Sequence, residues 1–413
     1  MKSGSSIHVG RPLALLFALA VCNPAAAHAA KERALYSFAG GGDGGFPQGN
    51  VVLDTKGNIY GTTQSGGGSG CGGGGCGTVF ELTAPGREKL LHVFTGGHDG
   101  AFPIAGLVMD DGGNLYGTTL NGGAHCQCGT VFKIAPDGSE HILYAFKGGE
   151  DGSRPLGALA FDGSGNLYGT TSAGGIDCNG FGVGCGTIFL IRPTGKHKVM
   201  YAFKGGADGI YPAAGLWLGI NGLFYGTTAN GGIDCDGTGQ GCGTVFQFAR
   251  RGTETVLYAF TGGDHGAYPA GGVVGDDSLN LYGTTNNGGI DCDGSGAGCG
   301  TVFKLAPDGA ESGLHVFQGG NDGENPRAAP LLDAEGNLYG TTAAGGSGSE
   351  NSAGVVFRIS PDGKEKILYA FTGGNDGGGP FSGLTADALG NFYGTTFTGG
   401  EFFNGTVFKL RHR

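Results

Sequence analysis

The chain is poor in the residues and patterns on which helical, membrane-spanning and nucleic-acid-binding proteins depend. Of its 413 residues only 14% are charged, and it has one tryptophan and three methionines. Its lysines and arginines form no cluster and the formal net charge is −11, so we expect neither nucleic acid nor an anionic membrane as a partner. After residue 30 no apolar run is long enough to cross a bilayer, and no window shows the apolar spacing of a helix. The sequence therefore predicts an all-β protein without a membrane span.

Glycine, in contrast, is abundant, and its placement is regular. The 95 glycines fall at fixed offsets within an internal repeat, which indicates turns and loops rather than low complexity. The repeat is marked by the sequence Tyr-Gly-Thr-Thr, which recurs at spacings of 52 to 57 residues. The seven copies begin at Tyr60, Tyr116, Tyr168, Tyr225, Tyr282, Tyr339 and Tyr393.

Each repeat contains four short segments rich in aromatic, β-branched and leucine residues. In the third repeat these segments are residues 143–146, 156–161, 166–171 and 186–190. Glycine, aspartate, asparagine or proline separates them, as expected between strands. The Asp-x-x-Gly-Asn and Pro-Asp-Gly sequences are typical of tight turns, so the strands should be antiparallel.

Seven units of four antiparallel strands predict a seven-bladed β-propeller. Residues 33–410 give 54 residues per blade, so residues 30–413 are interpreted as a single domain. The chain begins with one strand at 34–38 and ends with a third-strand sequence at 405–410. We expect the N-terminal strand to complete the last blade as its outermost strand, which closes the ring and removes a free sheet edge.

The N-terminus has the pattern of a secretory signal peptide. Lys2 and Arg11 precede an apolar run at 13–21, and Ala27-His28-Ala29 forms a cleavage site, so residues 1–29 should be removed. We therefore expect a protein secreted to the periplasm or the outside of the cell, and a monomer.

The repeat resembles the GloVer tandem repeat of bacterial exported proteins. The likeness is carried by Leu-Tyr-x-Phe-x-Gly-Gly-x-Asp-Gly, Asn-Leu-Tyr-Gly-Thr-Thr-x-x-Gly-Gly and Gly-Thr-Val-Phe-Lys-Leu, found for example at residues 368–377, 337–346 and 300–305. It covers essentially all of the chain after the signal peptide. The resemblance implies an exported, surface-associated protein and brings no catalytic residues. Because the sequence ends directly after the last strand, we expect a soluble form rather than one with a sorting anchor.

The strand order places all the long loops on one face of the propeller. The loop after the second strand and the link between blades share this long-loop face, and loops on a rigid scaffold often carry function. One position in the link, before a proline, varies while its surroundings do not. Its aromatic and polar side chains could bind a ligand or pack between blades. The candidate ligand-binding residues are Phe46, Phe102, Arg154, Tyr211, Tyr268 and Asn325, together with Arg327 nearby, and the seventh copy has Gly379.

The links also carry a ring of aspartates. In the interpretation that we favour, each carboxylate accepts local backbone N–H groups in an Asx-type turn. In the alternative, the ring binds a cation such as calcium, which prefers several oxygen ligands. The residues concerned are Asp43, Asp99, Asp151, Asp208, Asp322 and Asp376.

Ten cysteines lie between the second and third strands of blades one to five. Their close spacing in an exported protein predicts five local disulfides, each stapling a glycine-rich loop. Structural zinc is not expected, because each blade offers only two thiols, and no other metal or cofactor motif is present. The predicted pairs are Cys71/Cys76, Cys126/Cys128, Cys178/Cys185, Cys235/Cys242 and Cys292/Cys299.

Two functions from different classes fit these observations. The first is a binding or scaffold module whose ligand, a glycan, a protein or another envelope component, meets the long-loop face. The second is an extracellular hydrolase or lyase acting on carbohydrate at the channel mouth. An enzyme needs an asymmetric acid/base pair, and the near-identical acids of the repeats argue against one. We therefore favour binding.

Overall fold

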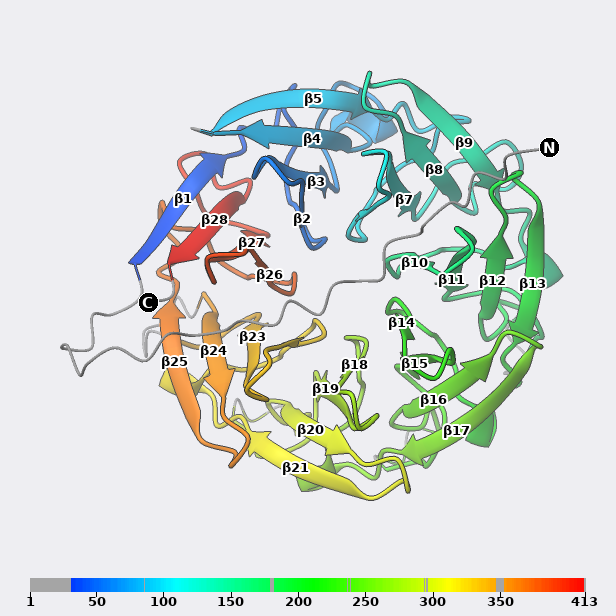
Figure 1. The fold of residues 1–413 in the computed structure, drawn as a ribbon, viewed down its shortest axis with the longest axis vertical. Helices are drawn as coiled ribbons and strands as arrows, with labels where there is room; N and C mark the ends of the chain where they lie inside the picture. The colour runs from blue at the N-terminus through cyan, green and yellow to red at the C-terminus, as the bar shows by residue number, and fades with distance from the viewer. Residues whose placement is uncertain are drawn as a thin grey trace, which may run out of the picture.

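The computed structural model describes residues 31–411, apart from 85, 179–181, 236, 238, 293, 295 and 347–352. The predicted signal peptide, residues 1–29, lies outside the described residues. Seven four-stranded antiparallel sheets form a ring around a central axis (Figure 1). The seven-bladed β-propeller predicted from the repeat is thus confirmed.

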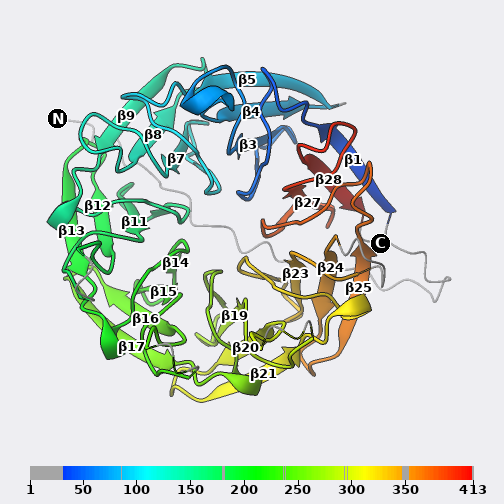
Figure 2. The same ribbon diagram turned by 180° about the vertical axis from the view of Figure 1, so that it is seen from behind.

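Each of the first six blades consists of four consecutive strands, of which the first lies nearest the axis (Figures 1 and 2). The strands of blades one to seven are, in order from the axis outwards: β2 (Val52–Leu53), β3 (Ile59–Thr63), β4 (Thr78–Thr83), β5 (Arg87–Val93); β6 (Val108–Met109), β7 (Leu115–Thr119), β8 (Thr130–Ile134), β9 (Glu140–Ala145); β10 (Ala160–Phe161), β11 (Leu167–Thr171), β12 (Thr187–Ile191), β13 (His197–Ala202); β14 (Trp217–Leu218), β15 (Phe224–Thr228), β16 (Thr244–Ala249), β17 (Thr253–Ala259); β18 (Val274–Gly275), β19 (Leu281–Thr285), β20 (Thr301–Leu305), β21 (Glu311–Val316); β22 (Leu331–Leu332), β23 (Leu338–Thr342), β24 (Val355–Ile359), β25 (Glu365–Ala370); β26 (Thr385–Ala386), β27 (Phe392–Thr396), β28 (Thr406–Arg411), β1 (Lys31–Ser37).

Helix is confined to single 3₁₀ turns in the described part of the chain. None of them is long or apolar enough to cross a membrane. The turns are η1 (Cys71–Gly73), η2 (Gly149–Asp151), η3 (Gly206–Asp208), η4 (Gly263–His265) and η5 (Gly320–Asp322).

The innermost strands are shorter than the sequence predicted. The apolar segment 156–161 was interpreted as a strand, but only Ala160–Phe161 pairs with β11. The reason is crowding around the axis, where the inner segments of neighbouring blades touch. A Cβ on Gly157 would lie 2.4 Å from the carbonyl carbon of Ala214 in the next blade. The inner segment therefore packs against its neighbour instead of extending the ladder.

The Tyr-Gly-Thr-Thr motif forms the second strand, and its residues have structural roles. A Cβ on Gly61 would lie 2.5 Å from Cζ of Phe80, so only glycine leaves room for that ring. The Thr63 hydroxyl lies 2.8 Å from the hydroxyl of Thr78 on the third strand. The Thr62 hydroxyl donates to a carbonyl oxygen of the next blade at 3.1 Å. The motif thus joins strands within a blade and blades to each other.

Seven pairs of phenylalanine rings hold adjacent blades together. In each pair, the ring that follows an outermost strand packs on the third-strand ring of the next blade, with centroids 5.1 to 5.3 Å apart. Such pairs contribute about 0.5–1.5 kcal/mol beyond the area they bury. The pairs are Phe38–Phe80, Phe94–Phe132, Phe146–Phe189, Phe203–Phe246, Phe260–Phe303, Phe317–Phe357 and Phe371–Phe408.

The N-terminal strand closes the ring, as predicted. β1 pairs antiparallel with β28 and becomes the outermost strand of blade seven, with Arg33 opposite Lys409. The strand continues into Phe38, whose N–H donates to the carbonyl oxygen of Gly405 at 3.0 Å. The ring of Phe38 then supplies the aromatic contact to Phe80 of blade one. The first and last strands of the described chain are therefore bonded in one sheet.

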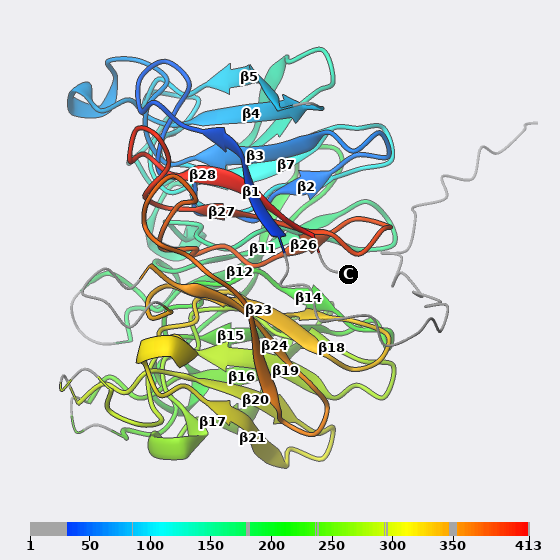
Figure 3. The ribbon, with the colours of Figure 1, turned by 90° about the vertical axis from the view of Figure 1, so that its left-hand side faces the viewer.

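The long loops and the short turns lie on opposite faces (Figure 3). On the long-loop face, a β-bridge joins each link to the loop after the second strand, for example Gly45 to Ser65. On the other face, the Asp110 carboxylate accepts the backbone N–H groups of Gly112 and Asn114 at 3.0 and 2.9 Å. The predicted separation of the two loop types is thus confirmed.

Candidate functional site

The residue before the link proline has a left-handed backbone conformation in every blade. Its φ lies between 55° and 63°, a range that side-chain-bearing residues rarely adopt. We call these seven residues the pre-proline ring: Phe46, Phe102, Arg154, Tyr211, Tyr268, Asn325 and Gly379.

Two backbone hydrogen bonds hold each member of the pre-proline ring in this conformation. The N–H of Tyr211 donates to the carbonyl oxygen of Cys185 in the preceding blade at 3.1 Å. The carbonyl oxygen of Tyr211 accepts the N–H of Ala229 in its own blade at 3.0 Å. The same pair of bonds recurs at all seven positions. Each side chain is therefore presented in the same way, whatever its chemistry.

The side chains of the ring differ in how much they are covered. Tyr211 is 41% exposed, and Arg154 is also exposed. Phe102 and Tyr268 are partly buried against the cores of their blade junctions. The sequence left ligand binding and packing open for these residues. The structure shows packing at Phe102 and Tyr268 and leaves Tyr211 and Arg154 accessible.

A continuous stack of side chains runs along the links of blades six, seven and one. The Arg327 guanidinium lies 4.5 Å from the centre of the Phe381 ring. Phe381 stacks on Phe397 with centroids 4.9 Å apart, and Phe397 packs on Phe46 at 5.1 Å. We call these four residues the aromatic arc. It brings together Phe46 and Arg327, which the sequence predicted, with two rings that it missed.

A signal for the two missed rings was present in the repeat. Phe381 follows a link proline and Phe397 follows a Tyr-Gly-Thr-Thr motif, and both positions vary from blade to blade. Blade four has only Ala213 and Ala229 at these positions. The first repeat has Gln48 and Gln64, whose side-chain amides are hydrogen-bonded to each other. The long-loop face is therefore bulky and aromatic on one side of the axis and small on the other.

Arg327 gives the aromatic arc a positive end. Burial lowers the pKa of its guanidinium from the usual value, but the group remains cationic at any physiological pH. Among the described residues, no hydrogen bond or ion pair engages this guanidinium. Its donors are therefore open to an acceptor on a ligand.

Arg154 lines a separate cavity of about 580 Å³ between the loops of blades two and three. Lys147 adds a second cation to its wall, and the Cys126–Cys128 pair and Val183 complete it. This size suits a small ligand. The predicted site residues therefore fall into at least two places, the aromatic arc and the Arg154 cavity.

The sequence matches the family model of the Gloeobacter/Verrucomicrobia repeat over residues 24–240 and 236–413. The chain belongs to this repeat family. No curated protein matches it. The extracellular domain of a hybrid two-component system from B. thetaiotaomicron is similar in structure, with 11% identity and a TM-score of 0.57. The match covers 93% of this chain and 40% of that one, and it shows the propeller fold alone. A gluconolactonase candidate matches with 15% identity, 81% and 93% coverage and a TM-score of 0.41.

In this Gloeobacter/Verrucomicrobia repeat protein the six link aspartates shape their turns. Each carboxylate accepts the backbone N–H of the residue four positions earlier, at 2.6 to 2.9 Å. Four of them also accept the hydroxyl of a tyrosine on the outermost strand, as Asp208 does from Tyr201 at 2.6 Å. These bonds support the interpretation that each carboxylate accepts a local backbone N–H group, but the donor lies four residues earlier rather than two residues later as in an Asx turn. Calcium binding by the ring stays a prediction.

The predicted cysteine pairs are brought together in blades one to five. Their Cα atoms lie 5.1 to 5.9 Å apart, within the range of disulfides. Both members of each pair lie between the second and third strands, as predicted, but the sequence did not indicate that the second member is buried in four blades. Cys76, Cys185 and Cys242 are fully buried, with 0% exposure, and Cys299 is 1% exposed.

The second cysteine is buried because it lies two residues before the third strand, beneath the link that enters the next blade. The carbonyl oxygen of Cys76 accepts the N–H of Phe102 at 2.8 Å, and that of Cys242 accepts the N–H of Tyr268 at 2.9 Å. Both cysteines pack in the hydrophobic cores of their blade junctions, as small apolar side chains commonly do. Each of these pairs therefore ties a loop to the core, and its buried member is not accessible to a ligand.

Among the described residues, two clusters of possible metal ligands join residues of neighbouring blades and were not predicted. In the first, Glu324 lies beside the Cys292/Cys299 pair. In the second, side-chain ligand atoms of His315, Asp322 and Glu365 lie within 4.8 Å of one another. His315 and Asp322 are 3.2 Å apart, so these groups already bond to each other.

Proposed function

We propose that this protein is an exported binding module and that its ligand is a glycan, held on the long-loop face by the aromatic arc and the accessible members of the pre-proline ring. The proposal rests mainly on one observation. Six of the seven pre-proline residues carry a side chain in a backbone conformation that glycine adopts without strain and that residues other than asparagine and aspartate rarely adopt.

This conformation costs a side-chain-bearing residue on the order of 1 kcal/mol or more. The chain is rich in glycine and uses it at the seventh position, Gly379, where the backbone is the same. Glycine at the other six would therefore remove the strain. The retention of Phe, Tyr, Arg and Asn there supports a role for the side chains themselves.

The chemistry of these side chains fits a sugar better than a purely apolar ligand. Aromatic rings offer apolar faces for the C–H side of a pyranose, and guanidinium and amide groups offer hydrogen bonds to its hydroxyl groups. The aromatic arc provides both, with the guanidinium of Arg327 over the Phe381 ring and the rings of Phe397 and Phe46 following it in the stack. A free guanidinium would also favour an acidic sugar.

Export is supported by the sequence and by the cysteines. Residues 1–29 have the pattern of a signal peptide. Disulfides persist in oxidising compartments, and five cysteine pairs stand at bonding separation. We infer a periplasmic or extracellular location for the mature chain.

The geometry favours binding over the alternative of a carbohydrate hydrolase or lyase. The carboxyl groups with strongly raised pKa values, such as Glu254 at about 8, belong to outermost strands. They lie beside link aspartates at the blade junctions, whereas an acid catalyst must reach the ligand. A protein ligand remains the second candidate for the long-loop face, because exposed Tyr211 would serve it equally well.

The direct test is a glycan array with the oxidised mature protein, with and without calcium. We expect selective binding that is lost or strongly weakened when Tyr211 and Arg154, the accessible members of the pre-proline ring, are both replaced by alanine. A matched control removes the exposed Leu389 and Ile220 from the short-turn face, and it should bind like the wild type. Glycan binding that requires calcium would indicate that the aspartate ring binds this cation. Binding to no glycan would contradict the proposal and leave a protein partner or a structural role.

A further inference from the structure

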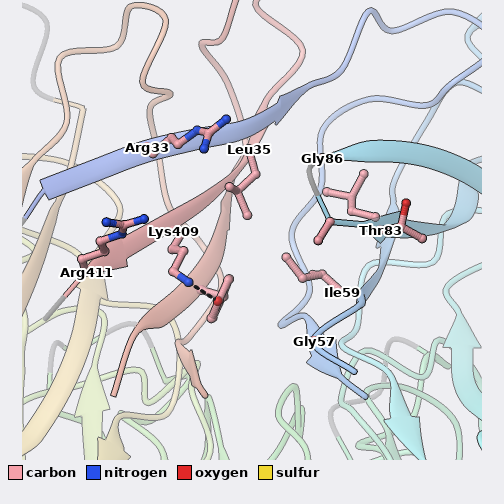
Figure 4. A pocket seen from close by; sticks show the side chains of 11 residues that line it. Arg33, Leu35, Gly57, Ile59, Thr83, Gly86, Lys409 and Arg411 are labelled. Atoms are coloured by element: carbon pink, nitrogen blue, oxygen red, sulfur yellow. Dashed lines mark hydrogen bonds between the residues drawn. The ribbon is translucent and has the colours of Figure 1, made fainter. Parts of the chain in front are cut away.

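We propose that a cavity at the junction of blades seven and one binds an amphipathic organic anion, a carboxylate or phosphate head joined to an apolar chain. The cavity has a volume of about 370 Å³. One wall is formed by β1 and β28, the strands that close the ring, and the other by β3 and the turn from β4 to β5 of blade one (Figure 4). It is distinct from the glycan site proposed above.

The wall formed by the closing strands is strongly basic. Arg33, Lys409 and Arg411 line the cavity, although the protein as a whole carries a net charge of −11. Arg33 stands directly opposite Lys409 in the β1–β28 ladder, and like charges in that position destabilise a sheet. The strands whose pairing closes the propeller thus carry a repulsion that an anion would relieve.

The protein itself neutralises only one of these cations. Lys409 donates to the hydroxyl oxygen of Tyr393 at 2.6 Å and lies 3.7 Å from the Asp387 carboxylate. In the described chain, neither Arg33 nor Arg411 makes a side-chain hydrogen bond or ion pair, and no carboxylate lines the cavity. Their guanidinium groups can therefore donate two parallel hydrogen bonds to a carboxylate or phosphate.

The other six blades provide an internal comparison. They have the same strand positions, but only blade seven has a cation at all three. In blade one, the position of Lys409 is taken by Glu81, which pairs with Lys89 at 3.7 Å. In blade six, it is taken by Arg358, which donates to the Asn337 side chain at 2.6 Å. Unpaired positive charge therefore accumulates at these three positions only in blade seven, where β1 and β28 close the ring.

The floor of the cavity is apolar. Ile59 and Leu82 of blade one are 4% and 1% exposed, and Leu35 of β1 reaches into the same space from the closing strand (Figure 4). A cavity of this size accommodates a short hydrocarbon chain or a ring. Cations on one wall and aliphatic side chains below them select a ligand with a charged head and an apolar body.

Binding of such an anion would also strengthen the ring closure. The ligand would touch β1, β28 and blade one at once, so it can be bound only while the propeller is closed. A ligand that binds only the closed form raises the melting temperature by mass action. The cavity would then link the folding stability of the ring to the presence of the anion.

The test uses calorimetric titration of the mature protein with octyl phosphate and octanoate, below their micelle concentrations. Inorganic phosphate supplies the head alone, and octan-1-ol supplies the chain alone. We expect at least one of the amphipathic anions to bind at least about tenfold more tightly than either fragment and to raise the melting temperature. Preference between the two anions identifies the head group.

The double variant Arg33→Gln, Arg411→Gln should weaken this binding about tenfold or more. Without ligand the variant should melt at the same or a higher temperature than the wild type, because a like-charge contact has been removed. A lower melting temperature would reveal a folding defect. The control Lys366→Gln changes the corresponding exposed cation of blade six and should bind like the wild type. Equal binding of the anions and octan-1-ol, unchanged binding in the double variant, or no binding would overturn the proposal.

Discussion

The carboxyl group of Glu365 in blade six lies within 4.8 Å of the carboxyl group of Asp322, which belongs to the link after blade five. Burial of the Glu365 carboxyl is the main cause that raises its pKa to about 9, and the neighbouring carboxylate of Asp322 is the second. Burial likewise raises the pKa of Glu254 to about 8, and of Glu32 and Glu140 to about 7. Each of these glutamates lies near the beginning of an outermost strand and faces an aspartate of the preceding junction. The blade junctions therefore hold protons near neutral pH.

This proton retention predicts that the folded state loses stability as the pH rises from 7 to 9. The unfolded chain releases glutamate protons near its ordinary pKa of 4.5, whereas the folded protein holds those of Glu254 and Glu365 up to about pH 8 and 9. Their stabilising effect is complete below pH 4.5 and is lost as the pH passes their folded pKa values. Solvent partly screens these carboxyl groups, which reduces the effect. We expect the free energy of unfolding, measured with urea, to fall by on the order of 1 kcal/mol between pH 7 and 9.

Two histidines determine the lowest pH at which the loss of stability can be assigned to the glutamates alone. Burial lowers the pKa of His92 and His197 below 6.5, so they oppose the trend only where the unfolded chain protonates them. Between pH 7 and 9 the folded protein keeps them neutral and the unfolded chain loses only its remaining histidine protons, so their opposing effect is small. The double variant Glu254→Gln, Glu365→Gln should flatten the dependence between pH 7 and 9, and an unchanged slope would rule out these carboxyls as its cause.

The closing strand predicts that the whole ring depends on residues 31–38. Their removal breaks the β1–β28 ladder and deletes the Phe38 ring, whose loss alone should cost about 3–5 kcal/mol. We expect the truncated chain to unfold in a single cooperative transition at a lower melting temperature, monitored by circular dichroism. The control is the mature chain without residues 1–29. A truncated chain that melts at the same temperature would show that closure does not depend on β1.

The backbone conformation of the pre-proline ring predicts that, at its positions, a glycine variant is more stable than an alanine variant, which reverses the usual order. At Tyr211, where φ is 63°, the glycine variant should be more stable than the alanine variant by about 1 kcal/mol, because alanine keeps the backbone strain. At the exposed strand residue Lys198, alanine should be the more stable of the two. Denaturant unfolding of the four variants measures both differences. The same order at both sites would mean that Tyr211 is not strained.

The structural reading of Tyr-Gly-Thr-Thr predicts that its glycine tolerates no methyl group. In Gly226→Ala the new Cβ would lie 2.7 Å from Cζ of the buried Phe246 ring, so the core must shift, at a cost of about 1–3 kcal/mol. Gly163→Ala is the matched control, since nothing lies within 4 Å of its Cβ. Thermal unfolding should separate the two variants clearly, and equal melting temperatures would contradict the packing argument.

The sequence was sufficient for the fold because the repeat itself specifies it. Seven copies of one unit gave the blade count, the turn sequences gave the two faces, and the unpaired third strand at 405–410 gave the closure by β1. The length of the innermost strands was not predictable in this way. Segments such as 156–161 are apolar enough for a strand, but crowding at Gly157 is set by the neighbouring blade.

The candidate site was only partly predictable, because its members belong to different repeats. Arg327, Phe381 and Phe46 come from three links, and their stacking depends on how blades six, seven and one are placed. The pairing of Glu365 with Asp322 is hidden for the same reason. Comparing every variable position across the repeats would have singled out Phe381 and Phe397. It would not have shown that they touch.

The cysteines show the same limit on a smaller scale. Their spacing was enough to pair them, because both members of each pair belong to one repeat. The burial of Cys76 and Cys242 depends on the link of the following blade, which covers them through Phe102 and Tyr268. No feature within a single repeat indicates that cover.

The central claim is that the long-loop face binds a glycan through these side chains. It is tested most directly by calorimetric titration of the best glycan from the array against three proteins: the wild type, a variant with Arg327→Ala and Phe397→Ala, and the Leu389→Ala, Ile220→Ala control. We predict that the first variant loses at least about tenfold in affinity, because it removes the cation and a central ring of the aromatic arc, while the control binds like the wild type. Equal affinity in all three would contradict the assignment of the ligand to this face.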